Sequence, residues 1–129
     1  MTRPGTGSGS ASSAGYAGDL SPKEAWDLLA RESGAVLVDC RSQAEWSFVG
    51  VPDLGSLSKR PFLVEWQSFV PGNAETGGKP RMAANANFVA EVAKTGISKD
   101  ALVVFICRSG GRSKSAAIAM TAAGWKTCF

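Results

Sequence analysis

The chain has 129 residues, of which 44% are apolar and 19% are charged, so its size and composition fit one ordinary globular domain. Its formal net charge of +3 is too small to indicate a nucleic-acid-binding protein, although converging positive charges can still bind a small anion. The absence of histidine excludes Ser-His and Cys-His dyads, most zinc hydrolases and histidine phosphorelays.

The first two segments are a tail and an amphipathic helix. Residues 1–15 are almost all Gly, Ser, Ala, Thr and Pro, and they bury too little apolar surface to offset the entropy of ordering. We therefore expect a disordered tail, followed by a single domain over residues 16–129. Ser21 is a candidate N-cap, Pro22 occupies the first helical position and Glu24 completes a capping box.

Short apolar runs then alternate with helical patterns. The predicted strands cover residues 35–38, 62–66, 101–106 and 125–129. The predicted helices cover residues 41–48, 85–96 and 112–123, and a polar, glycine-rich loop covers residues 71–81. This alternation indicates an α/β fold with a mainly parallel sheet, in which ligands bind at the carboxyl ends of the strands. Cys107 follows the clearest of these strands.

The segment CRSGGRS, residues 107–113, lies between a predicted buried strand and a helix. The paired glycines are expected to allow positive φ values, so that successive N–H groups converge in an anion-binding nest. The following helix adds the positive end of its dipole, and both effects lower the pKa of a cysteine at the centre. Arg108 and Arg112 add positive charge, and Arg112 opposes the helix dipole, which favours a ligand role. The alternative is that Cys107 is a small buried apolar residue beside a simple turn.

CRSGGRS after ALVVFI resembles the active-site loop of rhodaneses, C-R-x-G-x-R followed by Ser or Thr. DCRSQAEW, residues 39–46, resembles the upstream rhodanese motif D-x-R-x-x-x-E followed by an aromatic residue. Gly50 lies where the family has a glycine, and SPKEAWDLLA is similar to the first helix of the family. Val51 and Pro52 depart from the usual His-Ile. The chain stops at Phe129, inside the predicted last strand, so we expect a C-terminally truncated sequence or a domain without its last layer.

The resemblance implies a rhodanese-like three-layer fold, with about five parallel strands and helices on both faces. It implies a thiosulfate sulfurtransferase-like enzyme in which Cys107 carries sulfane sulfur as a persulfide from thiosulfate or a persulfide donor to a thiophilic acceptor. No cofactor or metal is needed. The expected scaffold residues are Asp39, Arg41 and Glu45. The expected substrate-binding residues are those of the loop, Arg108, Ser109, Gly110, Gly111, Arg112 and Ser113.

Two other functions remain open. Phosphatases and arsenate reductases of the same fold also use a cysteine thiolate, but they resemble one another in a C-x5-R loop of seven residues. Here Cys107 to Arg112 spans six residues, C-x4-R, a smaller ring of amides that favours sulfur over a tetrahedral phosphate. A non-catalytic rhodanese-like binding module usually lacks the cysteine or the glycines, and this sequence has both.

The three cysteines, Cys40, Cys107 and Cys128, leave one unpaired whatever pairs form, and their spacing matches no metal site. We expect free thiols in a reducing, cytoplasmic compartment, with Cys40 in the core and Cys128 on the terminal strand. Structural roles are favoured for both, and the alternative, a resolving role, requires a sulfur close to Cys107. The expected partners are a small anionic sulfur donor and a protein or low-molecular-weight thiol acceptor. We expect no nucleic acid and no membrane, since no apolar run approaches roughly 18 to 20 residues.

Overall fold

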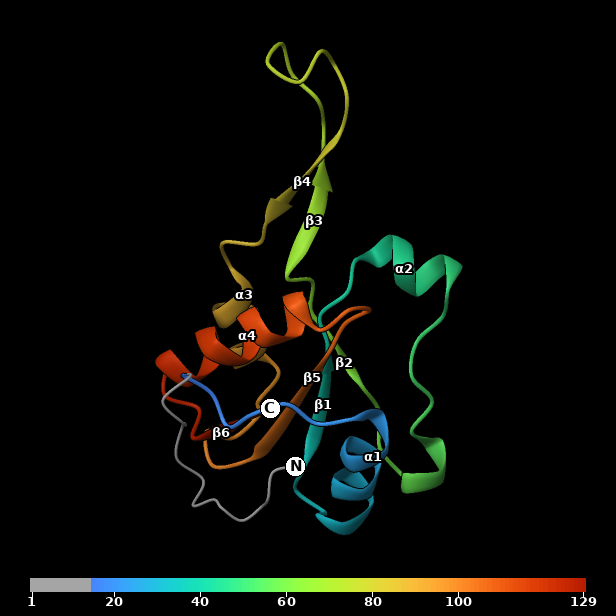
Figure 1. Cartoon of the computed structure of the whole chain (residues 1–129), viewed down its shortest axis with the longest axis vertical. Helices are drawn as coiled ribbons and strands as arrows, with labels where there is room; N and C mark the ends of the chain where they lie inside the picture. Colours follow the sequence, from blue (N-terminus) through green and yellow to red (C-terminus); the bar gives the residue numbers. More distant parts are fainter. Residues whose placement is uncertain (1–14) are drawn as a thin grey trace.

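Four parallel strands form the central sheet of the computed structural model, which describes residues 15–129 (Figure 1). Their order across the sheet is β2-β1-β5-β6. Their bounds are Val36–Asp39 for β1, Phe62–Leu63 for β2, Leu102–Ile106 for β5 and Thr127–Cys128 for β6. The central pair, β1 and β5, is mostly apolar and mostly buried, as expected of strands covered on both faces. The prediction of an α/β fold with a parallel sheet is confirmed.

The number of strands in the sheet, and the structure of residues 62–84, differ from the expectation. Within residues 15–129 the parallel sheet has four strands rather than about five. The strand predicted at residues 62–66 ends early, and the chain continues into β3 (Gln67–Val70), which pairs antiparallel with β4 (Arg81–Ala84). This hairpin extends away from the rest of the molecule (Figure 1). Because two adjacent antiparallel strands satisfy each other's backbone groups locally, they form without joining the main sheet.

Helices cover both faces of the sheet. α1 (Pro22–Arg31) and the 3-10 helix η1 (Gly55–Leu57) pack on one face, and α3 (Phe88–Lys94) and α4 (Gly111–Ala122) pack on the other. The short helix α2 (Gln43–Phe48) follows β1 and has no buried residue. The capping box predicted at the start of α1 is present: the Glu24 N–H donates to Ser21 Oγ at 3.1 Å, and the Ser21 N–H donates to Glu24 Oε1 at 2.8 Å. The predicted helix at residues 85–96 is shorter than expected at both ends.

The core is divided by the sheet into two apolar clusters. Leu37 of β1 packs with α1, whereas Val38, the next residue, packs with α3 and α4. Successive side chains of a strand point to opposite faces, so this division follows directly from the strand geometry. Three layers result, with the sheet in the middle.

The N-terminal segment of the described chain lies against the end of the sheet. The Ala17 N–H donates to the carbonyl of Cys128 at 2.8 Å, and Tyr16 is buried. The tail expected at residues 1–15 lies outside the described residues, except for Gly15. No helix within residues 15–129 has the length and apolar character needed to cross a membrane.

Candidate active site

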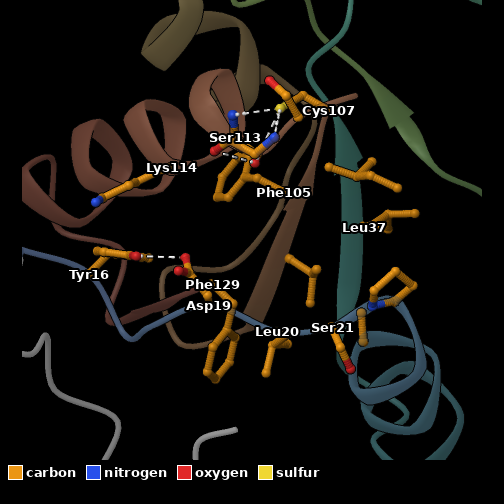
Figure 2. A pocket seen from close by; sticks show the side chains of 16 residues that line it. Tyr16, Asp19, Leu20, Ser21, Leu37, Phe105, Cys107, Ser113, Lys114 and Phe129 are labelled. Carbon is orange, nitrogen blue, oxygen red and sulfur yellow. Dashed lines mark hydrogen bonds between the residues drawn. The ribbon is translucent and has the colours of Figure 1, made fainter.

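Cys107 lies directly after β5 and before α4, at the carboxyl edge of the sheet, with its sulfur facing the start of the helix (Figure 2). Its Sγ accepts hydrogen bonds from the N–H groups of Gly110, at 3.1 Å, and Ser113, at 3.3 Å. Ser113 Oγ lies 3.4 Å from the same sulfur. The loop therefore places several donors around one sulfur atom, which is the arrangement that the sequence predicted.

The two glycines of the loop have different conformations. Gly110 is the N-cap of α4 and has φ +94°, in the left-handed region that other residues rarely adopt. Gly111 begins the helix and does not have a positive φ. The expectation of positive φ at both positions therefore holds only for Gly110. One left-handed residue is enough to turn the chain from the loop into the helix, and the first helical residue needs a negative φ.

The environment of Cys107 favours the thiolate. Burial raises the pKa of Cys107, but hydrogen bonds outweigh this effect and hold the pKa below the ordinary value of a cysteine. The donors are the side chain of Ser113 and the N–H groups of Ser113, Gly110 and Arg112. The Ser113 hydroxyl also lies within 3.1 Å of the Gly110 carbonyl, so it has a second partner when the sulfur is protonated. A half-buried thiolate with several donors is an activated nucleophile.

Arg112 is bound to α2 rather than left free beside the sulfur. Its Nη1 lies 2.6 Å from Glu45 Oε1, and its Nη2 lies 3.0 Å from Glu45 Oε2. The hydrogen bond from Arg112 is the largest influence that lowers the pKa of Glu45, to about 2, and further hydrogen bonds come from Ser42. This two-point ion pair fixes the first turn of α4 against α2.

Arg108 is the second arginine of the loop, and its side chain is exposed. Among the residues that the structure describes, its guanidinium has no hydrogen-bond or ion-pair partner. It is therefore an exposed cation of the loop without a counter-ion in the described part of the chain.

Asp39 and Arg41 form a second ion pair behind the loop. Asp39 is completely buried, and Arg41 Nε and Nη2 lie 2.9 and 2.6 Å from its two carboxylate oxygens. Arg41 also donates to the carbonyl of Gly50 at 2.7 Å, which attaches the chain after α2 to the end of β1. The side chains predicted as scaffold, Asp39, Arg41 and Glu45, are thus all engaged in ion pairs next to the loop.

Ser42 contributes to this arrangement, and the sequence reasoning did not select it. It caps α2 in a second capping box: the Glu45 N–H donates to Ser42 Oγ at 3.3 Å, and the Ser42 N–H donates to Glu45 Oε1 at 3.0 Å. The signal was present as a serine three residues before a glutamate. The same Glu45 carboxylate therefore caps α2 and binds Arg112.

A pocket of about 400 Å³ adjoins the loop. Figure 2 shows Cys107 and Ser113 at one end of this pocket and Tyr16, paired with Asp19, farther along it. The apolar lining includes Leu37, Phe105 and Phe129.

The other two cysteines are core residues, as the sequence predicted for Cys40. Cys40 and Cys128 are both fully buried, and all three cysteines are free thiols. Burial is the main reason that the pKa of Cys40 is raised to about 12 and that of Cys128 to about 11. Both thiols are therefore protonated at neutral pH, and their pKa values are shifted in the opposite direction to that of Cys107.

Comparison with known proteins identifies a family model, a solved structure and several relatives that are similar to this chain. The model of the rhodanese-like domain matches residues 21–129. The crystal structure of Rv0390 from M. tuberculosis has a TM-score of 0.71 and 43% sequence identity, covering 88% of this chain and 75% of that one. The uncharacterized protein RP600 homolog of Rickettsia rickettsii is 35% identical over 109 residues, which are 82% of this chain and 73% of that protein. The uncharacterized protein RC0915 of Rickettsia conorii is 34% identical over 107 residues, with the same coverage.

Proposed function

The chain belongs to the rhodanese-like domain family, and on that basis we propose that it is a sulfurtransferase that carries sulfane sulfur as a persulfide on Cys107. The observation that supports this most directly is the set of N–H donors on Cys107 Sγ, which favours the thiolate. Fold alone does not define activity, so the proposal depends on this site.

In the first step, the Cys107 thiolate attacks the outer sulfur of thiosulfate or of a persulfide donor. A new S–S bond forms, the S–S bond of the donor breaks, and sulfite or a thiolate leaves with the electron pair. The outer sulfur then carries the negative charge of the persulfide. The N–H groups around the loop stabilise this charge because they are already oriented toward the sulfur position.

In the second step, a thiophilic acceptor attacks the outer sulfur and restores the Cys107 thiolate. Cyanide would leave as thiocyanate, and a thiol acceptor would become a persulfide. We propose a low-molecular-weight thiol or a cysteine of a protein as the acceptor, and a cytoplasmic location, where reduced thiols persist. Neither step needs a metal or a cofactor.

The two arginines of the loop have different parts in this proposal. Arg108 is exposed, so its charge attracts an anionic donor to the mouth of the site. Arg112 is held by Glu45, so it mainly fixes the orientation of the N–H groups at the start of α4.

Intact-mass measurement after incubation with thiosulfate tests the proposal. We expect the wild-type protein to gain the mass of one sulfur atom, and cyanide to remove it with release of thiocyanate. Cys107→Ser should gain nothing, whereas Cys128→Ser, which removes a buried thiol outside the loop, should gain the sulfur as the wild type does.

Aryl phosphate hydrolysis is measured in parallel, because the same fold includes phosphatases. Phosphate release that depends on Cys107, without any gain of sulfur, would overturn sulfur transfer in favour of phosphate chemistry. If a sample with a native circular dichroism spectrum shows neither activity with thiosulfate or with a glutathione persulfide donor, the proposal is wrong.

A further inference from the structure

Cys40 is the neighbour of Cys107 on the adjacent strand. The parallel register of β1 and β5 ends with Asp39 opposite Ile106, so Cys40 and Cys107 form the next pair in line. The Cys40 N–H donates to the carbonyl of Ile106 at 3.0 Å, which continues the ladder to this pair. Adjacent strands lie about 4.8 Å apart, within the range of about 4.4 to 6.8 Å that Cα atoms of a disulfide span.

Both side chains lie on the same face of the sheet. Cys40 is part of the buried cluster that also contains Val38 and Phe105, and Cys107 packs against this cluster. Cys40 Sγ lies 3.3 Å from the carbonyl oxygen of Ile106, whose carbon is bonded to the nitrogen of Cys107. The Cys40 thiol is therefore directed at the backbone of the reactive cysteine. Consistent with this proximity, the pKa of Cys40 is raised first by burial and next by the charge of Cys107.

The two thiols differ in access. Cys40 is completely buried, so a reagent from solvent cannot reach it, whereas Cys107 is half-buried and borders the pocket. Low-pKa, accessible cysteines with a second cysteine beside them are the ones that form reversible oxidation products. An oxidant would thus meet Cys107 first and Cys40 only through Cys107.

We propose that this pair gives the protein a second activity, the reduction of a hydroperoxide by Cys107 followed by closure of a Cys40–Cys107 disulfide. The Cys107 thiolate attacks the terminal oxygen of the hydroperoxide, the O–O bond breaks, and the alcohol or water leaves after taking up a proton. Cys107 is then a sulfenic acid, oxidised by two electrons. The Cys40 sulfur attacks the Cys107 sulfur, the S–S bond forms, the S–O bond breaks, and hydroxide leaves with the Cys40 proton as water.

The disulfide protects the active-site sulfur from irreversible oxidation. A sulfenic acid that is not captured reacts with more peroxide to give sulfinic and then sulfonic acid. A dithiol reductant reverses the disulfide and returns the thiolate. This activity requires only a reactive Cys107 thiolate, so it can be tested independently of sulfur transfer.

Cys128 provides a matched control because it is equally buried but placed elsewhere. It lies opposite Val103, four residues before Cys107 along β5. At about 3.3 Å per residue this is a separation of roughly 13 Å along the strand, too far for a disulfide with Cys107.

The test is exposure of the reduced protein to hydrogen peroxide, followed by alkylation and intact-mass measurement without reductant. The wild type should lose the mass of two hydrogen atoms and retain one alkylatable thiol. Proteolysis should yield one linked pair of peptides, containing Cys40 and Cys107, that dithiothreitol separates. Cys128→Ser should form the same link and retain no alkylatable thiol.

Cys40→Val should instead gain the mass of two or three oxygen atoms on Cys107. Cys40→Ala serves as a second variant, and circular dichroism with thermal unfolding identifies the one that folds as the wild type does. The inference is wrong if the wild type gains oxygen on Cys107 as these variants do, or if its disulfide joins two molecules. Persulfide formation with thiosulfate, measured on the same samples before oxidation, reports separately on the sulfurtransferase proposal.

Discussion

Glu45 and Arg112 lie 67 residues apart in the sequence and form a two-point ion pair at the site, with oxygen–nitrogen distances of 2.6 and 3.0 Å. Glu45 also caps α2, and Arg112 lies in the first turn of α4, whose N–H groups surround Cys107 Sγ. The orientation of the loop therefore depends on a residue far from it in the sequence. Four predictions test this and the other contacts of the site.

Glu45→Gln should lower the free energy of unfolding by about 1 to 3 kcal/mol, because it leaves the partly buried Arg112 guanidinium without its counter-charge. Urea unfolding at neutral pH measures the change. Asp27→Asn is the control, because it removes an exposed ion pair with Lys23 that solvent and salt screen, so its effect on stability should be smaller. Equal losses in the two variants would show that the Glu45–Arg112 pair does not stabilise the fold more than a surface pair does.

The stability of the protein should fall in acid in a way that depends on Glu45. Its pKa is lowered from an ordinary value of 4.5 to about 2 in the folded state, chiefly by the hydrogen bond from Arg112. A lowered folded pKa contributes stability that is complete above the unfolded pKa and is lost as the pH falls from about 4.5 toward 2. Urea midpoints measured across this range should decline more steeply for the wild type than for Glu45→Gln. Parallel declines would contradict the prediction.

Ser113→Ala should raise the pKa of Cys107. Burial raises this pKa, the Ser113 hydroxyl is the largest of the hydrogen-bond effects that lower it, and the backbone donors remain in the variant. The pH profile of alkylation by iodoacetamide should therefore move to higher pH, with a slower rate at neutral pH. Ser115→Ala, an exposed position on the same helix, should leave the profile where it is. A profile for Ser113→Ala that matches the wild type would exclude a role for the hydroxyl in ionisation.

Gly110→Ala should destabilise the protein and Gly111→Ala should not, although the residues are adjacent. An added Cβ meets no atom within 4 Å at either position, so the difference comes from the backbone alone. At Gly110, with φ +94°, alanine should cost about 1 to 2 kcal/mol of unfolding free energy. At Gly111, in the first helical position, alanine should leave stability unchanged or raise it by up to about 1 kcal/mol. Urea unfolding distinguishes these outcomes, and equal costs would show that Gly111 also needs its flexibility.

The elements that local sequence determines were predictable. The runs at residues 35–38 and 101–106 are apolar without interruption, and they form the two central strands. The capping box at Ser21 predicts the first residue of α1 correctly. The loop from Cys107 to Ser113 was predictable for the same reason, because the turn, the nest and the helix start are all encoded within seven residues.

The features that depend on pairing between distant segments were not predictable. Residues 81–84, RMAA, lack the alternation of a half-buried strand, and they are a strand because residues 67–70 lie beside them. The partner of Arg112 was also not evident, since the local sequence does not say which carboxylate faces it. The position of Cys40 beside Cys107 depends on the register of β1 against β5, and apolar runs buried on both faces leave that register open.

The hydrogen bonds that lower the pKa of Cys107 exist only in the folded protein. The donors that favour its thiolate are backbone N–H groups held by a turn and a helix, and this helix is fixed by Glu45 from a segment synthesised much earlier. In an unfolded chain these groups are hydrated and scattered, and Cys107 is an ordinary thiol like Cys40 and Cys128. Under the proposed sulfur transfer, a newly made or unfolded molecule would react more slowly with a sulfur donor than a folded one, so the loop itself would restrict loading to folded protein.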